Sequence, residues 1–227
     1  MLVWGLTAAA ALTAGGVAVG RALERKEWQT VIQGKGKAEE ASKIRSMIEY
    51  RAAIHEAGHT ICAWHDPYVR RITLVTIDPT RAGLAGHVNY TASTNPAAAA
   101  KWYAISVNMG GIASEFCEFG KARSGGSKRD LEHAREAAKA IVKAGSPVAP
   151  WARAEERVEA SDNIARMFGS GLDPEIGRIL NIGYAYSRDL VEQDRARLML
   201  VTNHLCRSGD LKAKEIKRIF GKRAFWV

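Results

Sequence analysis

The residues at positions 55–59, His-Glu-Ala-Gly-His, restrict the fold of this chain more than any other part of its sequence. In an α-helix, two histidines four positions apart lie on the same face of the helix, about one turn apart. At that spacing His55 and His59 can bind one zinc ion, and Glu56 lies beside them, where it can take a proton from a zinc-bound water. The sequence therefore predicts a helix, from about residue 48 to 64, that carries a metal site for hydrolytic chemistry.

A catalytic zinc ion needs a third protein ligand, and the sequence offers three candidates. His65 continues the histidine spacing, but Cys62 stands where a helix-breaking glycine would turn His65 inward, so we expect His65 to point away. Glu115 lies in a second predicted helix, where it can be a ligand or a carboxylate that orients a histidine. Asp130 is predicted to open a helix after a Gly/Ser loop, where it can reach the metal or cap the helix with Ser127. The residues alone leave this choice open.

The remaining pattern predicts a mainly α (α+β) domain with a small β-sheet beside the HExxH helix. Residues 70–77 are β-rich, and residues 87–91 form a candidate returning strand. The first of these strands is a candidate edge strand for pairing with an extended substrate. Further helices are predicted at residues 96–119, 130–142, 151–168, 174–192, 195–207 and 212–220.

The N-terminal segment predicts a membrane anchor. Residues 2–19 carry no charged side chain, and about 20 apolar residues span a bilayer. Arg21, Arg25 and Lys26 follow, and the positive-inside rule then places the rest of the chain on the cytoplasmic side. We therefore predict a single-pass transmembrane helix at 1–20, a juxtamembrane helix or linker at 21–47 and a folded domain at 48–227. The net charge is +9, and the basic residues that follow the anchor fit a membrane surface, so we expect no nucleic-acid partner.

Three segments, in this order, resemble the peptidase domain of the FtsH-type membrane-anchored zinc metalloproteases. Residues 54–59 are similar to that family's H-E-A-G-H core, and residues 110–120 are similar to its G-G-R-x-A-E-E-x-x-x-G segment. Residues 124–134 resemble its T-G-A-S-N-D-L loop and helix start, and residues 210–216 resemble its closing pattern. The resemblance covers roughly residues 48–221 of this chain.

This resemblance implies a helical, zincin-like metallopeptidase fold with Zn²⁺ held by His55, His59 and Asp130. It implies that Glu115 is a nearby active-site carboxylate. The chain departs from the family pattern before Asp130, where it has one more residue and Lys128-Arg129 in place of asparagine. The family also joins its peptidase domain to an AAA+ ATPase module and acts as hexameric rings, whereas this sequence contains no G-x-x-x-x-G-K-[ST] motif.

We therefore expect a membrane-anchored, zinc-dependent endopeptidase that cleaves unfolded or flexible proteins, with Glu56 activating a zinc-bound water. One alternative is a non-proteolytic adaptor or scaffold that keeps the peptidase fold. Another is a peptidase subunit that works with a separate AAA+ ATPase, as a homo-oligomer such as a hexamer. The intact His55, Glu56 and His59 favour the enzyme over the adaptor.

Overall fold

The computed structural model describes residues 37–78, 86–93, 98–122, 124–145, 148–151 and 172–221. The chain divides into two compact units, Met1–Ile48 and Glu49–Val227. In the first unit, the described residues 37–48 are helical, and the predicted anchor at 1–20 lies outside them. Within the described residues, no helix combines the length and the apolar character that crossing a membrane requires.

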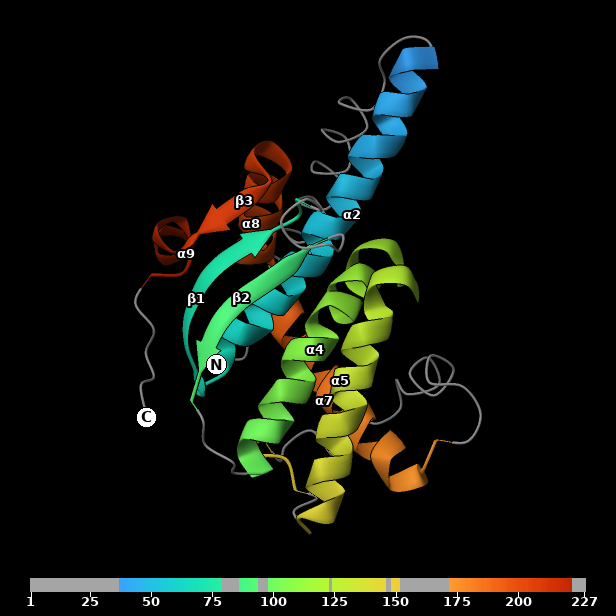
Figure 1. The fold of residues 1–227 in the computed structure, drawn as a ribbon, viewed down its shortest axis with the longest axis vertical. Helices are drawn as coiled ribbons and strands as arrows, with labels where there is room; N and C mark the ends of the chain where they lie inside the picture. The colour runs from blue at the N-terminus through green and yellow to red at the C-terminus, as the bar shows by residue number, and fades with distance from the viewer. Residues whose placement is uncertain are drawn as a thin grey trace, which may run out of the picture. The chain divides into compact units, whose positions relative to one another are not determined.

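The second unit is mainly helical with a small sheet, which confirms the predicted class of fold (Figure 1). The HExxH motif lies on α2 (Lys37–His65), which begins well before the predicted start at residue 48. Most of the helix predicted at residues 151–168 lies outside the described residues. The other elements are β1 (Val69–Thr76), β2 (His87–Ala92), α4 (Ala98–Phe119), α5 (Ser124–Lys143), α7 (Pro174–Gln193), α8 (Arg195–Ser208), β3 (Asp210–Lys212) and α9 (Ala213–Phe220).

The backbones of α2 and α4 touch where two glycines meet. A Cβ atom on Gly110 would lie 2.5 Å from the carbonyl oxygen of Gly58, and a Cβ on Gly58 would collide with the carbonyl oxygen of Gly110. The Ser114 hydroxyl on α4 donates a hydrogen bond of 2.8 Å to the carbonyl of Ile54 on α2. Because no side chain separates the two helices here, the residues of α4 lie directly against the HExxH motif.

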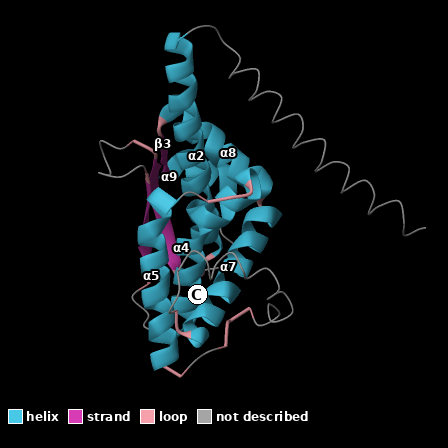
Figure 2. Cartoon of the chain, turned by 90° about the vertical axis from the view of Figure 1, so that its right-hand side faces the viewer, coloured by secondary structure: helices cyan, strands magenta, loops and turns pink. Residues whose placement is uncertain are grey.

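Helix α5 packs against α4, and α4 also packs against α7 (Figure 2). The prediction that α5 starts at Asp130 is wrong, because the helix begins at Ser124. The reason is a stripe of buried residues at helical spacing, Ser127, Ala134, Ala138 and Ile141, which stabilises the first turn despite its glycines. Asp130 therefore projects from the second turn of a formed helix, and Ser127 lies inside that helix.

The sheet is antiparallel, with the strand order β2-β1-β3. The short strand β3 was not predicted, and it pairs with β1 from Leu74↔Lys212 to Thr76↔Asp210. On its other side β1 pairs with β2 along the whole of β2. The prediction that β1 is an edge strand is therefore wrong: β1 is central, and among the described residues the outer edge of β2 is unpaired.

Candidate metal centre

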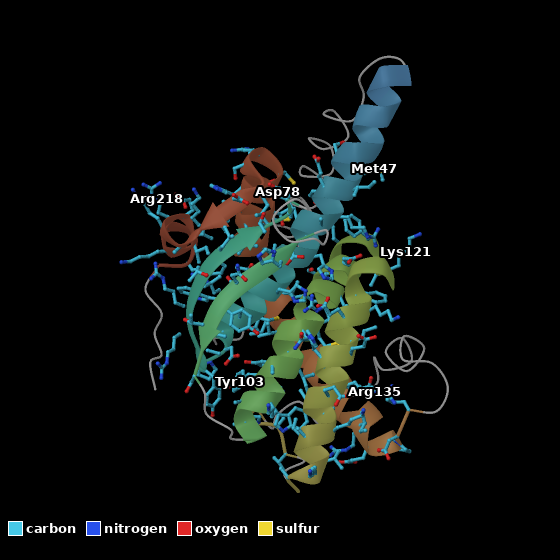
Figure 3. The ribbon with its side chains drawn as sticks, viewed as in Figure 1. Met47, Asp78, Tyr103, Lys121, Arg135 and Arg218 are labelled. Atoms are coloured by element: carbon cyan, nitrogen blue, oxygen red, sulfur yellow. The ribbon has the colours of Figure 1, made fainter. Side chains whose placement is uncertain are left out.

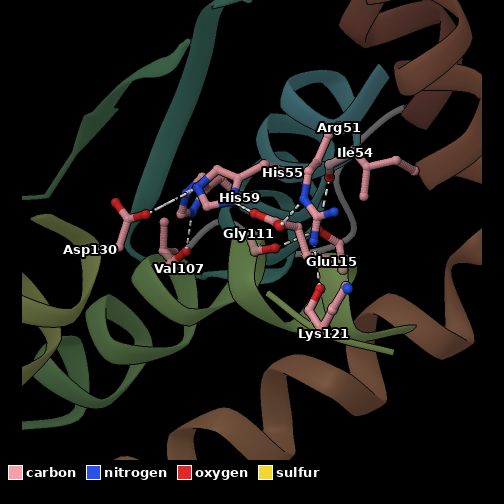
Figure 4. Close-up of polar contacts among 10 residues, drawn as sticks. Arg51, Ile54, His55, His59, Val107, Gly111, Glu115, Lys121 and Asp130 are labelled. Carbon is pink, nitrogen blue, oxygen red and sulfur yellow. Dashed lines mark hydrogen bonds and ion pairs between the residues drawn. The ribbon is translucent and has the colours of Figure 1, made fainter. Parts of the chain in front are cut away.

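The structure brings together the histidines of α2 and the aspartate of α5 (Figure 4). His55 Nε2 lies 3.0 Å from His59 Nε2 and 3.1 Å from Asp130 Oδ2. The third side of this triangle, from His59 Nε2 to Asp130 Oδ2, measures 3.4 Å. The carboxylate of Asp130 therefore faces both imidazoles, although the sequence just before it departs from the family pattern.

The other ring nitrogen of each histidine contacts an acceptor of the protein. His55 Nδ1 donates to Glu115 Oε1 over 2.8 Å, and His59 Nδ1 donates to the carbonyl oxygen of Val107 over 2.7 Å. Both acceptors lie on α4. For the neutral imidazoles they favour the tautomer with the proton on Nδ1, in which the Nε2 lone pair of each ring can bind a cation.

The dimensions and chemistry of this triangle fit a zinc ion. Two imidazole nitrogens and one carboxylate oxygen form a donor set that zinc accepts in catalytic sites. Tetrahedral coordination at bond lengths of about 2.0–2.1 Å places ligand atoms about 3.3 Å apart. The observed separations of 3.0, 3.1 and 3.4 Å bracket that value.

The electrostatics of the three side chains are strongly coupled. Burial alone would lower the pKa of His55, but its hydrogen bonds to Asp130 and Glu115 outweigh burial and raise the pKa to about 10. Burial likewise opposes charge on His59, and the carboxylate of Asp130 outweighs it and raises the pKa of His59. The pKa of Asp130 is lowered in turn: burial would raise it, but the two histidines prevail. Without a cation, this cluster therefore holds positive charge in the position that a metal would take.

Glu56 lies beside the cluster and is 6% exposed. Its Oε2 is buried and has no hydrogen-bond partner among the described residues. Its Oε1 and Cγ lie against Gly86, where a Cβ atom would come within 2.7 Å of each. Burial raises the pKa of Glu56, with the neighbouring histidines opposing that shift. A buried, basic carboxylate with an unpartnered oxygen has the properties of a general base.

A model of peptidase family M41 matches residues 43–219. The chain belongs to peptidase family M41. This membership confirms the predicted resemblance and, at the level of the family, the predicted zinc-dependent peptidase class.

The M41 match is accompanied by similarity to curated FtsH proteins. The chain is 27% identical to "ATP-dependent zinc metalloprotease FtsH 1" of Petrotoga mobilis, over 80% of this chain and 29% of that protein. It is 27% identical to "ATP-dependent zinc metalloprotease FtsH 2" of Symbiobacterium thermophilum, over 81% of this chain and 32% of that protein. The chloroplastic FTSH 6 of Arabidopsis thaliana is 25% identical, over 90% of this chain and 30% of its own length. The chain thus spans about a third of the length of these relatives.

Glu115 and His65, the other two candidates for the third zinc ligand, do not point into the triangle of ligand atoms. Glu115 contacts His55 on the Nδ1 side of the ring, and its Oε2 accepts a hydrogen bond of 2.7 Å from Arg51. Both oxygens of Glu115 are therefore engaged away from the triangle. His65 forms an ion pair of 2.9 Å with Asp194 and takes no part in the cluster, as its predicted orientation requires.

Sequence reasoning missed three residues that shape the M41 site: Arg51, Gly86 and Gly111. A Cβ atom on Gly111 would lie 2.6 Å from Nε2 of His55, so the imidazole fits only against a bare backbone. The pair of glycines before Glu115 was a signal for such a close approach. Arg51 lies one helical turn before His55 on the same helix, but nothing in the sequence indicates its partner, 64 positions away.

Proposed function

We propose that this M41 domain is a zinc-dependent endopeptidase in which His55, His59 and Asp130 hold the metal and Glu56 transfers the proton. The observation that carries this proposal is the convergence of two Nε2 atoms and one carboxylate oxygen within 3.0–3.4 Å of one another. The unpartnered oxygen of Glu56 beside them supports the second role.

In the proposed reaction, different residues of the chain have different roles. When bound, zinc would lower the pKa of a water molecule from about 15.7 toward about 7 and would polarise the scissile carbonyl. Glu56 accepts the proton of that water and then delivers it to the leaving nitrogen. Its raised pKa suits both steps, because a more basic carboxylate takes the proton more readily and still returns it to an amine. Glu115 and Val107 hold the two imidazoles in the orientation that the metal requires.

The outer edge of β2 supports a preference for extended, unfolded substrates. Gly86, just before β2, contacts Glu56, and residues 89–92 of the strand are exposed. A peptide that pairs with this edge would be bound through its backbone, so an unfolded chain would be recognised with little regard to sequence. A peptide whose amides are N-methylated at alternate positions should therefore bind with a higher KM than its unmodified form. Equal KM values for the two would contradict pairing at β2.

We also propose partners, an assembly and a location for the domain. The relatives carry "ATP-dependent" in their names, and this chain matches about a third of their length. We extend the proposal to an AAA+ ATPase that delivers unfolded chain, and to a hexameric ring anchored by residues 1–20 with the peptidase domain on the cytoplasmic side. Measuring the mass of the detergent-solubilised protein tests the ring, and labelling of introduced cysteines from each side of the membrane tests the anchor.

The enzyme and the adaptor are separated by two measurements on the purified full chain. The zinc content of the protein is measured first, and digestion of casein is then followed with and without a chelator. We expect about one zinc ion per chain and digestion that the chelator stops. A folded protein that neither contains zinc nor accepts it would overturn the proposal, and a zinc-loaded protein that leaves casein intact would favour the adaptor.

A further inference from the structure

The guanidinium group of Arg51 links three parts of the M41 domain. Its Nε donates to Glu115 Oε2 on α4 over 2.7 Å. Its Nη2 donates to the carbonyl oxygen of Lys121 over 2.6 Å, and its central carbon lies 4.4 Å above the ring of Phe119. Lys121 lies in the turn between α4 and α5 (Figure 3). Arg51 itself stands on α2, one turn before His55.

The carboxylate of Glu115 is held between Arg51 and His55. Oε2 accepts from the Arg51 Nε, and Oε1 accepts from the His55 Nδ1, so the plane of the carboxylate is fixed on both sides (Figure 4). Glu115 is 4% exposed, which leaves water little access to replace either contact. The orientation of the imidazole therefore depends on a donor that does not touch it.

The second contact of Arg51 concerns the helix that carries Asp130. Lys121 is close to the start of α5 at Ser124, and Asp130 projects from the second turn of α5. A guanidinium can donate to two acceptors in a fixed planar arrangement, which a lysine ammonium cannot reproduce. Arg51 thus connects α2, which carries the two histidines, to the turn from which the aspartate-bearing helix departs.

We propose that Arg51 is a positioning residue for the metal centre, which acts through Glu115 on His55 and through the turn at Lys121 on α5. The inference rests on the proposed function, because it assumes that the triangle binds zinc. It assigns a role in metal affinity to an arginine that touches neither the metal ligand atoms nor Glu56.

A second ion pair in the same domain provides a matched control. Arg195 Nη2 lies 2.6 Å from Oε2 of Glu118, one turn beyond Glu115 on α4. The arginine side chains of the two pairs are almost equally exposed, 18% for Arg51 and 17% for Arg195. The other oxygen of Glu118 accepts from the Tyr50 hydroxyl and not from a histidine. Loss of either arginine should therefore lower the stability of the protein to a similar degree, but only loss of Arg51 should weaken metal binding.

The test compares Arg51→Met and Arg195→Met in the full-length protein. Zinc affinity is measured by competition with a chromophoric chelator, and the visible spectrum of the Co²⁺-loaded protein reports the ligand geometry. We expect Arg51→Met to weaken zinc binding about 10-fold and to change the Co²⁺ spectrum, because partners that orient a ligand typically contribute at least that much. Arg195→Met should leave both readouts as in the wild type. Arg51→Lys keeps the charge but not the planar arrangement, so its zinc affinity should lie between those of the wild type and Arg51→Met.

Equal zinc affinities for Arg51→Met and Arg195→Met would overturn the inference. If Arg51→Met does not fold, Arg51→Lys decides: weakened zinc binding supports the role, and wild-type affinity removes it. Failure of the proposed function gives a different result, because the wild-type protein itself would then bind no zinc.

Discussion

Gly111 on α4 faces the imidazole of His55 so closely that a Cβ atom at position 111 would lie within 2.6 Å of both Cε1 and Nε2 of the ring. Nε2 is the nitrogen that points toward Asp130. The absence of a side chain at Gly111 therefore sets the position of a proposed metal ligand, and substitutions there should disturb the site before they disturb the fold.

Replacing Gly111 with alanine should displace His55 and weaken zinc binding. The overpacking should also lower the free energy of unfolding by about 1–3 kcal/mol. Gly177→Ala in α7 is the control, because a Cβ there would meet its nearest neighbour, a side-chain atom of Leu172, at an ordinary 3.4 Å. That variant should keep its zinc and gain up to about 1 kcal/mol from helix propensity. Zinc content and urea unfolding of both variants check this, and normal zinc binding by Gly111→Ala would contradict it.

Glu56→Gln should abolish most proteolysis while the protein keeps its zinc. Loss of a general base typically lowers the rate about 10²–10⁴-fold. The same variant should be more stable than wild type at neutral pH, because it removes a buried carboxylate whose pKa is raised and whose Oε2 has no partner among the described residues. The measurements are casein digestion, zinc content and thermal unfolding, with Glu132→Gln on the exposed face of α5 as the control. Undiminished cleavage by Glu56→Gln would remove the proposed mechanism.

Asp130→Ala and Glu115→Gln should have different effects on the metal. Asp130→Ala removes a direct ligand in our proposal, so the purified variant should contain little zinc. Glu115→Gln removes a charge that contacts His55 from the far side of the ring, and it should keep zinc with about 10–100-fold weaker affinity. Zinc stoichiometry and chelator competition distinguish the two. The reverse pattern, with zinc retained in Asp130→Ala and lost in Glu115→Gln, would make Glu115 the third ligand.

The stability of the metal-free protein should fall as the pH rises above neutrality. The pKa of His55 is raised from 6.5 to about 10 in the folded state. Its contribution to stability is therefore complete below pH 6.5 and is lost as the pH rises toward about 10. Zinc binding has the opposite dependence, because protons compete with the metal for the imidazoles at lower pH. The difference in melting temperature between zinc-loaded and chelator-treated protein should thus grow with pH.

Two variants check the origin of this pH dependence. His55→Asn should flatten the decline in stability of the metal-free protein. His65→Asn should preserve it, because His65 pairs with Asp194 outside the cluster. A melting-temperature difference that stays constant between pH 6.5 and 9 would show that the coupling within the cluster is weaker than its geometry implies.

The positions of His55 and His59 could be predicted because their relationship is local. Helical spacing alone brings two residues four apart onto one face, and it needs no knowledge of the rest of the chain. Asp130 was predicted through the family resemblance and not from spacing. Its place in a formed helix was missed because serine and glycine in the first turn of α5 have low helix propensity, which packing against the core overrides.

The arrangement of the sheet and the role of Arg51 depend on contacts between distant segments. Strand β3 has three residues with one buried side chain, Leu211, so its sequence contains no alternating pattern to detect. Without β3, the sequence predicts β1 as an edge strand, whereas in the structure β1 is the central strand. The pair of Arg51 and Glu115 joins residues 64 positions apart, and a single sequence contains no signal for such a partner.

His55 and Asp130, whose ligand atoms are 3.1 Å apart, are separated by 75 positions in the sequence. A cation bound between them would therefore be a cross-link as well as a cofactor, closing a loop of a length for which the chain-entropy model of a disulfide gives about 4 kcal/mol. The availability of zinc would then determine how stably α5 is held against α2, and the zinc-free protein would be cleaved more readily by other proteases.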